Sequence, residues 1–222
     1  MYLKALIFDM DGVIVDTEYQ DFSIQKEFIK LFNPHSNYSD KELLVLVGKS
    51  YLTLYKLLQH FIGEEYSIEK IEKEYGVFSD VKYSKLNYRE LFREDIIKIL
   101  DFSVENGIKL ALASSSKYKH IIEILESCGI RGYFDVIVSG ENFMESKPNP
   151  EIYQATLNEL SVQAEQCIAI EDSYSGIEAS TSAGIATIGY YDSRLPPFND
   201  KANWKVGSMQ EALNVIQSQH EF

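Results

Sequence analysis

The hydrophobic and polar positions in the second half of the chain alternate between two periods. From about residue 94, apolar residues on a helical spacing are separated by short, mainly apolar runs of strand length. The predicted strands are Leu6–Phe8, Ile108–Ala113, Asp135–Val138, Cys167–Ile170 and Ile185–Ile188. The predicted helices are 94–105, 117–128, 150–160, 175–183 and 209–217. Because helices alternate with strands, we expect βαβ units and a parallel sheet, with strands buried on both faces.

A second pattern covers residues 17–88, where only helical spacing is found. The predicted helices there are 17–33, 39–47, 51–62, 67–75 and 81–92, with a capping box at Ser39-Asp40-Lys41-Glu42 and Ser50 as a further N-cap. We therefore predict a doubly wound, Rossmann-like α/β core of residues 1–16 and 89–222, interrupted by an all-helical domain, residues 17–88. Leu195–Phe198 is expected to be a surface connector.

Composition narrows the classes of partner. The chain has 222 residues, 45% of them hydrophobic, which is enough for a full core, and a formal net charge of -13. This charge argues against nucleic acid and against an anionic membrane surface, because no basic block exists to neutralise phosphates. A small anionic substrate remains possible, since a local cation can override the overall field.

Other features of the sequence point to a reducing compartment. The apolar runs are far shorter than the roughly 20 residues of a membrane helix, and the chain enters a strand directly, so we expect neither a membrane span nor a signal peptide. Cys128 and Cys167 are the only cysteines and form no C-x-x-C motif. We expect buried, inert thiols and a cytoplasmic protein with no obligate protein partner.

Candidate chemistry follows two of the predicted strands as paired carboxylates. Asp9 and Asp11 come directly after Leu6–Phe8, and Glu171-Asp172 follows Cys167–Ile170. Crowded carboxylates repel each other unless a cation joins them, and hard oxygen ligands suit Mg²⁺. Each pair also has an ordinary structural interpretation, because Asp-Gly is a common turn signal and a carboxylate beside Ser173 can cap a helix.

Hydroxyl groups and a lysine follow the two other strands. Ser114-Ser115-Ser116-Lys117 is typical either of a helix N-cap or of a phosphate site at a helix start. Lys147, in Ser146-Lys147-Pro148-Asn149-Pro150, is either a solvated surface lysine or a fixed positive charge for a phosphate. Because the carboxyl ends of parallel strands share one edge of a sheet, the four groups together indicate phosphoryl transfer.

These motifs resemble those of a known family. The matching pieces are Asp9-Met10-Asp11-Gly12-Val13 with Asp16-Thr17-Glu18, Ala113-Ser114-Ser115-Ser116-Lys117, Ser146-Lys147-Pro148-Asn149-Pro150-Glu151-Ile152-Tyr153, and Glu171-Asp172-Ser173 with Gly176-Ile177. In order and spacing they resemble the haloacid dehalogenase superfamily of phosphatases, in the branch with a helical cap after the first strand. That branch includes β-phosphoglucomutase and the sugar-phosphate phosphatases.

The resemblance implies a phosphatase mechanism. Asp9 would attack phosphorus and form an aspartyl-phosphate, and Asp11 would protonate the leaving oxygen and then deprotonate water. Mg²⁺ would be held by an Asp9 oxygen, the Asp11 carbonyl and Asp172, with Glu171 nearby. The Ser114 hydroxyl, the Ser115 N–H and Lys147 would hold phosphate oxygens, and Lys147 would also offset the charge on Asp9.

Departures from the mutase pattern guide the choice of substrate. The mutase-like members carry a His shortly after the Thr of Asp-Thr, whereas this chain has Thr17-Glu18-Tyr19-Gln20-Asp21. They also carry an Arg after Gly-x-Ser, whereas Gly48-Lys49-Ser50 is followed here by Tyr51. We therefore favour a phosphatase for a small phosphorylated metabolite, a sugar or polyol phosphate, over a phosphosugar mutase.

Two further questions stay open at the level of sequence. Substrate contacts are predicted in the cap at Tyr19, Gln20, Lys49 and Tyr51, although surface or packing roles would also explain these residues. A non-catalytic sugar-phosphate sensor with the same fold is the alternative from a different class of protein. His35, His60, His120 and His220 are scattered along the chain, so no zinc site is proposed.

Overall fold

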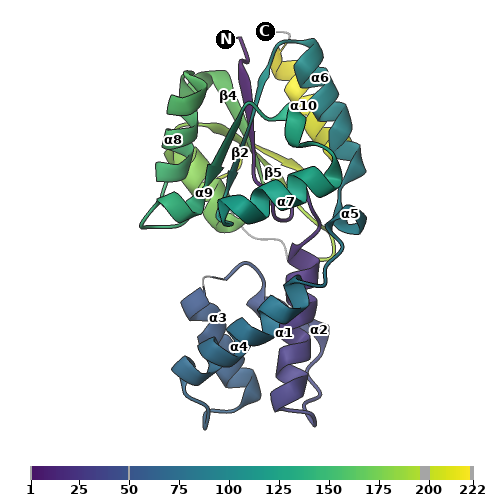
Figure 1. Ribbon diagram of the computed structural model, residues 1–222, viewed down its shortest axis with the longest axis vertical. Coiled ribbons are helices and arrows are strands. Elements are labelled where there is room, and N and C mark those ends of the chain that lie inside the picture. Colours follow the sequence, from purple (N-terminus) through teal and green to yellow (C-terminus); the bar gives the residue numbers. More distant parts are fainter. Residues whose placement is uncertain (1, 50, 196–200, 221–222) are drawn as a thin grey trace. The chain divides into compact units, whose positions relative to one another are not determined.

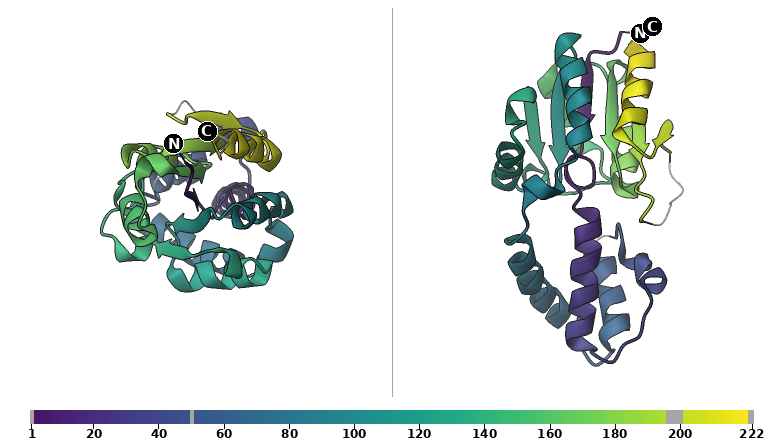
Figure 2. Two further views of the ribbon diagram at one scale, coloured as in Figure 1. Left: turned by 90° about the horizontal axis from the view of Figure 1, so that it is seen from above. Right: turned by 90° about the vertical axis from the view of Figure 1, so that its right-hand side faces the viewer.

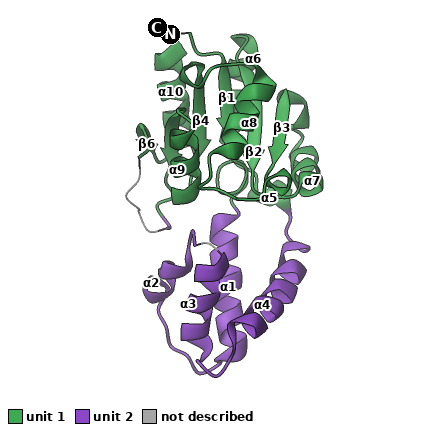
Figure 3. Ribbon diagram, turned by 90° about the vertical axis from the view of Figure 1, so that its left-hand side faces the viewer, with its two compact units in different colours: residues 1–16, 88–193, 197–222 green, residues 17–87, 194–196 purple. Residues whose placement is uncertain are grey.

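The computed structural model describes residues 2–49, 51–195 and 201–220, and the chain divides into two compact units (Figures 1 and 3). Unit 1 comprises Met1–Asp16, Tyr88–Ser193 and Pro197–Phe222, and unit 2 comprises Thr17–Asn87 with Arg194–Pro196. Ser50 and residues 196–198 of the predicted connector lie outside the described residues. Within the described ranges, no helix is long and apolar enough to cross a membrane.

Unit 1 is built on a parallel sheet, as the alternating pattern predicted. Its six strands among the described residues are β1 (Ala5–Phe8), β2 (Lys109–Ser114), β3 (Val136–Ser139), β4 (Cys167–Glu171), β5 (Ala186–Tyr190) and β6 (Trp204–Val206). They run in the order β3-β2-β1-β4-β5-β6, so β1 lies between β2 and β4. Phe8 is in register with Leu112 on one side and with Ile170 on the other. The ends of these three strands therefore lie side by side.

Helices cover both faces of this sheet (Figure 2). One hydrophobic cluster joins the sheet to α6 (Ile97–Glu105), α7 (Tyr118–Cys128) and α10 (Met209–His220). A second cluster joins the opposite face to α8 (Glu151–Leu160) and α9 (Tyr174–Ser182). Successive β1 residues alternate between the clusters, with Leu6 and Phe8 in the first and Ala5 and Ile7 in the second. The doubly wound α/β fold is confirmed.

Unit 2 is all-helical within its described residues. Its helices are α1 (Glu18–Phe32), α2 (Asp40–Leu43), α3 (Tyr51–Ile62) and α4 (Ile68–Tyr83), which surround a separate apolar cluster. Phe28 lies inside this cluster, with its ring centroid 5.2 Å from that of Tyr75 and 5.5 Å from that of Phe78. The predicted capping box is present, because the Ser39 side chain accepts from Glu42 N and the Glu42 side chain accepts from Ser39 N.

The sequence prediction was wrong for residues 67–92. In place of two helices, 67–75 and 81–92, one helix, α4, continues through Gly76 and ends at Tyr83, and the short α5 (Tyr88–Leu91) follows. A glycine inside a helix costs about 1 kcal/mol relative to alanine. Packing of Tyr75 and Phe78 against Phe28, on both sides of the glycine, outweighs that cost.

The remaining regular elements are short. Single 3₁₀ turns occur at Leu44–Leu46, Glu94–Ile96, Arg131–Tyr133, Gly140–Asn142 and Ala164–Gln166. Strand β6 was not predicted, because three residues with an exposed lysine in the middle give no detectable alternation. Both cysteines are free and buried, as expected, and burial raises the pKa of Cys167 to about 12.

Candidate active site

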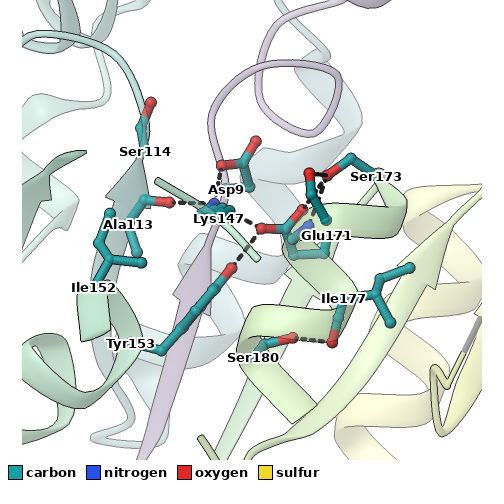
Figure 4. Close-up of polar contacts among 12 residues, drawn as sticks. Asp9, Ala113, Ser114, Lys147, Ile152, Tyr153, Glu171, Ser173, Ile177 and Ser180 are labelled. Carbon is teal, nitrogen blue, oxygen red and sulfur yellow. Dashed lines mark hydrogen bonds and ion pairs between the residues drawn. The ribbon is translucent and has the colours of Figure 1, made fainter. Parts of the chain in front are cut away.

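Lys147 is buried at the carboxyl edge of the sheet, and its ammonium has three partners. Nζ donates to Asp9 Oδ1 at 2.6 Å, to Glu171 Oε1 at 2.7 Å and to the Ala113 carbonyl at 2.9 Å. Figure 4 shows the lysine between the two carboxylates. An ammonium has three protons, and these acceptors account for all of them. The interpretation of Lys147 as a solvated surface lysine is therefore wrong.

Asp9 is placed by the strand that precedes it. It directly follows β1, and its backbone N–H donates to the Ile170 carbonyl at 3.0 Å, which continues the ladder between β1 and β4. The side chain is buried, and its Oδ1 is held by Lys147. Backbone and side chain are thus both fixed, which is the preorganisation that a nucleophile needs.

Glu171, the last residue of β4, is fully buried beneath the site. Its Oε1 accepts from Lys147 and also from the Tyr153 hydroxyl, at 2.5 Å. Tyr153 lies in the first turn of α8, and the Lys147 ammonium lies 5.1 Å from its ring centroid. The Glu171 carboxylate therefore holds the Lys147 ammonium in place, and the Tyr153 hydroxyl holds the Glu171 carboxylate.

The charges of these groups do not balance. Burial raises the pKa of Asp9 to about 7; Lys147 opposes this shift, and Glu171 and Asp11 add to it. Burial alone would lower the pKa of Lys147, but the Asp9 and Glu171 carboxylates outweigh burial and raise it. One lysine is thus shared between two buried carboxylates, and the excess of negative charge favours a bound cation.

A set of carboxylate oxygens is available for such a cation. Ligand atoms of Asp9, Glu171 and Asp172 all lie within 4.8 Å of one another. An all-oxygen set of this kind suits Mg²⁺. Oε1 of Glu171 accepts from both Lys147 and Tyr153, whereas Oε2 accepts from the Ser173 hydroxyl at the longer distance of 3.4 Å. The residues present therefore fit a divalent cation.

Asp11 lies two residues after Asp9, on a tight turn. The N–H groups of Ile14 and Val15 donate to the Met10 carbonyl at 2.8 and 3.2 Å, which closes the turn. Gly12 has a φ of 79°, a conformation that favours glycine. The half-buried Asp11 carboxylate accepts from the Ser116 hydroxyl at 3.1 Å. This bond links the turn to the segment after β2.

The serines at and after the end of β2 do not cap the following helix. The N-cap of α7 is Lys117, which makes no side-chain capping bond. The buried Ser114 Oγ accepts instead from Ser116 N at 3.1 Å, and Ser115 is exposed. The N-cap of α9 is Ser173, which accepts from Gly176 N at 3.0 Å. The capping interpretations of Ser114 and of the Glu171-Asp172 pair are therefore wrong.

The four predicted substrate contacts all belong to unit 2. The Arg194 guanidinium lies 4.7 Å from the ring centroid of Tyr19 in α1, and Gln20 is half-buried on the same helix. Lys49 is exposed, and the exposed Tyr51 opens α3. Their role in binding stays a prediction.

Two residues of the site, Tyr153 and Ser116, were not predicted from the sequence. Tyr153 belongs to the lysine motif, but nothing local in the sequence indicates its hydrogen bond to Glu171, 18 positions away. Ser116 was grouped with its neighbours, although its hydroxyl is the one that reaches Asp11. Only the position of Tyr153 in the first turn of a helix after the motif could have drawn attention to it.

Gly176 is required by the position of Glu171, and we expect Gly176→Ala to damage the site. An added Cβ would lie 1.9 to 2.1 Å from the carboxylate atoms of Glu171. Since Lys147 and Tyr153 hold that carboxylate, overpacking should cost about 1–3 kcal/mol in the free energy of unfolding. Displacement of the lysine should lower kcat/KM for a phosphate ester about 10-fold or more.

Urea unfolding and steady-state kinetics check this expectation. The matched control is Gly132→Ala, where an added Cβ meets no atom within 4 Å. Equal behaviour of the two variants would contradict the tight packing of Glu171.

Comparison with known proteins agrees with this geometry. A family model described as haloacid dehalogenase-like hydrolase matches residues 6–190. The phosphorylated carbohydrates phosphatase of Thermotoga maritima is 32% identical over 224 residues, which cover 96% of this chain and 98% of that protein. The beta-phosphoglucomutase of Bacillus subtilis is 30% identical over 191 residues, covering 84% of this chain and 83% of that protein.

A solved structure leads to the same family. The beta-phosphoglucomutase of Clostridium difficile has a TM-score of 0.72 and 26% sequence identity, with 99% of this chain and 97% of that chain covered. These comparisons agree with the doubly wound fold and with the motifs at the strand ends. The chain belongs to the haloacid dehalogenase-like hydrolase family and is one of its phosphatases.

Proposed function

We propose that the protein is a Mg²⁺-dependent phosphoryl hydrolase that acts on a small phosphorylated metabolite, a sugar or polyol phosphate, through an aspartyl-phosphate. The observation that carries this proposal is the buried Asp9 carboxylate, which Lys147 holds at 2.6 Å and which lies two residues before Asp11. Bound Mg²⁺ would be held by an Asp9 oxygen, the Asp11 carbonyl and Asp172, with Glu171 nearby, and would supply charge neutralisation.

The reaction runs in two steps on the residues of this chain. A carboxylate oxygen of Asp9 attacks phosphorus, and the ester oxygen leaves with a proton from Asp11. Water then attacks the phosphorus of the aspartyl-phosphate and gives a proton to Asp11, so inorganic phosphate leaves and both aspartates return to their starting state. Lys147 offsets the negative charge that develops during both steps.

Ser114 and Ser115 complete the proposed phosphate site. The Ser114 hydroxyl already accepts from Ser116 N, so its own proton can be donated to a phosphate oxygen. The Ser115 N–H would donate to a second oxygen. Lys147 would lie beside the phosphate and offset its charge; to bind a phosphate oxygen directly, its ammonium would exchange one of its three present acceptors for that oxygen. This arrangement binds the phosphoryl group and leaves the alcohol part of the ester to be recognised elsewhere.

We assign that recognition to a cap of residues 17–88, with Tyr19, Gln20, Lys49 and Tyr51 as candidate contacts. A cap that closes would exclude water during transfer. The name of the Thermotoga maritima relative supports a phosphorylated carbohydrate as substrate. The free, buried cysteines are compatible with a cytoplasmic location, and we propose no nucleic-acid, membrane or obligate protein partner.

A phosphosugar mutase is the second candidate, because one relative is named beta-phosphoglucomutase. A mutase must hold a second phosphate, and Arg does so with a bidentate fork that Lys49 cannot reproduce. Residues 17–21 also lack the His of the mutase-like members. We therefore place hydrolysis first.

A phosphatase screen tests the proposal. We expect the protein to release phosphate from p-nitrophenyl phosphate and from some members of a panel of sugar and polyol phosphates in the presence of Mg²⁺. EDTA should abolish this activity, and added Mg²⁺ should restore it. Nucleotide phosphates serve as the comparison class.

Each alternative has its own outcome in the same screen. Efficient conversion of β-glucose 1-phosphate to glucose 6-phosphate would favour the mutase. Inactivity on every ester, with sugar-phosphate binding intact by calorimetry, would favour the non-catalytic sensor.

A further inference from the structure

Arg93 is a half-buried arginine that the proposed chemistry does not use. It precedes the 3₁₀ turn Glu94–Ile96, and 15% of its side chain is exposed. Nε donates to the Gly12 carbonyl at 3.0 Å, and Nη1 donates to the Tyr190 hydroxyl at 2.9 Å. Nη2 lies 3.2 Å from Asp16 Oδ1 and 3.5 Å from Asp192 Oδ2. Every nitrogen of the guanidinium therefore contacts a different partner.

One of these partners belongs to the turn that carries Asp11. Gly12 directly follows Asp11, and glycine has the largest backbone freedom of any residue. The turn is closed from within by bonds to the Met10 carbonyl and by a bond from Gly12 N to the Val15 carbonyl at 2.8 Å. The Gly12 carbonyl points out of this loop to Arg93. Loss of the arginine would leave that peptide group without this donor.

The other partners make the arginine rigid. Its backbone N–H donates to the Ile14 carbonyl at 3.0 Å, and Asp16 N donates to the Leu91 carbonyl at 2.8 Å, which pairs the turn with the segment before Arg93. The guanidinium also lies 4.7 Å from the ring centroid of Tyr190, at the end of β5. Arg93 is thus fixed to the sheet on one side and to the turn on the other.

We propose that Arg93 is a positioning residue that holds the Asp11 turn in place through the Gly12 carbonyl, so that Asp11 can protonate the leaving group. This inference rests on the proposed function, in which Asp11 is the general acid. It concerns unit 1 alone. It assigns to Arg93 no contact with the substrate.

The test uses two aryl esters whose leaving groups need a proton to different degrees. The 4-nitrophenolate ion is a weak base and leaves without protonation, whereas phenolate is more basic and depends on the acid. The parameter kcat/KM covers the steps up to departure of the leaving group. In Arg93→Met, we expect kcat/KM for phenyl phosphate to fall at least tenfold further than kcat/KM for p-nitrophenyl phosphate.

A structural role alone would lower both kcat/KM values by the same factor, so equal losses overturn the proposal, as do wild-type values in a folded variant. Arg89→Met is the matched control, since the exposed Arg89 contacts the Ser127 and Cys128 carbonyls and should leave the ratio unchanged. If wild type hydrolyses neither ester, the proposed function fails instead.

Arg93→Lys keeps the proposal testable if Arg93→Met does not fold. Lysine retains the charge beside Asp16 and Asp192, but one ammonium cannot replace the planar fork that spans four partners. We expect a folded protein with a cooperative urea transition, together with at least a threefold shift in the ratio of the two kcat/KM values. A folded Arg93→Lys with the wild-type ratio overturns the positioning role.

Discussion

Asp9→Asn is expected to reduce Mg²⁺-dependent release of phosphate from p-nitrophenyl phosphate by on the order of 10⁴-fold or more, as is typical when a covalent nucleophile is removed. Asparagine is nearly isosteric with aspartate, so Lys147 and Glu171 keep their places, but a neutral amide oxygen does not attack phosphorus. The backbone bond from residue 9 to the Ile170 carbonyl is unaffected by the change. The loss should therefore appear in kcat and not in the fold.

Phosphate release and intact-mass spectrometry measure this effect. Wild type quenched during turnover should show the added mass of a phosphoryl group, and Asp9→Asn should not. The control is Asp101→Asn, which changes an aspartate that pairs with the exposed Tyr133 hydroxyl at 2.7 Å. Wild-type turnover by Asp9→Asn would show that another group attacks phosphorus.

The sequence predicted most of the fold because its signals are local. The runs that end at Phe8, Ala113 and Ile170 are short and almost entirely apolar, which favours burial in a parallel sheet. The edge at which Asp9, Ser114 and Glu171 lie then follows from topology, since β2, β1 and β4 are neighbours. Helix α4 was divided wrongly at Gly76, where tertiary packing overrides the intrinsic preference of one residue.

Contacts between distant elements were not predictable in the same way. Tyr153 bonds Glu171, and Arg93 bonds Gly12, across 18 and 81 residues. Neither bond follows from spacing along the chain, because it depends on how α8 and the segment after α5 pack on the sheet. Sequence motifs identify the residues that carry the chemistry, whereas the residues that hold them in position are identified only from the three-dimensional structure.

Lys147→Met is expected to weaken the fold as well as the activity. Removal of one partner from a buried ion pair costs about 3–5 kcal/mol, because the remaining charge is left without compensation. Here two carboxylates, Asp9 and Glu171, lose their shared ammonium. Turnover should fall on the order of 10²–10³-fold through lost charge stabilisation. Lys119→Met, at an exposed lysine paired with Glu123, should change neither property appreciably.

The stability loss of Lys147→Met should depend on pH in metal-free protein, with a sign set by Asp9. Burial already raises the pKa of Asp9 from 3.8 to about 7 in the presence of the lysine, and without the lysine it should rise further. An acid with a raised folded pKa binds its proton more tightly in the folded state, so stability falls as pH rises from the unfolded to the folded pKa.

Below pH 7, Asp9 is protonated in the folded wild type and in the folded variant alike, so both lose stability equally as the pH rises. Above pH 7, Asp9 of the wild type ionises beside Lys147 and its stability falls no further. The variant has no ammonium there, so its folded state keeps the proton and continues to lose stability. Urea unfolding in EDTA should therefore show a larger deficit for Lys147→Met at pH 8 than at pH 5. The double variant Asp9→Asn/Lys147→Met should recover part of the deficit at pH 8, because the carboxylate that lacked a partner is gone. A deficit that is equal at both pH values, and unchanged in the double variant, would mean that Lys147 supports the fold by packing and not by charge.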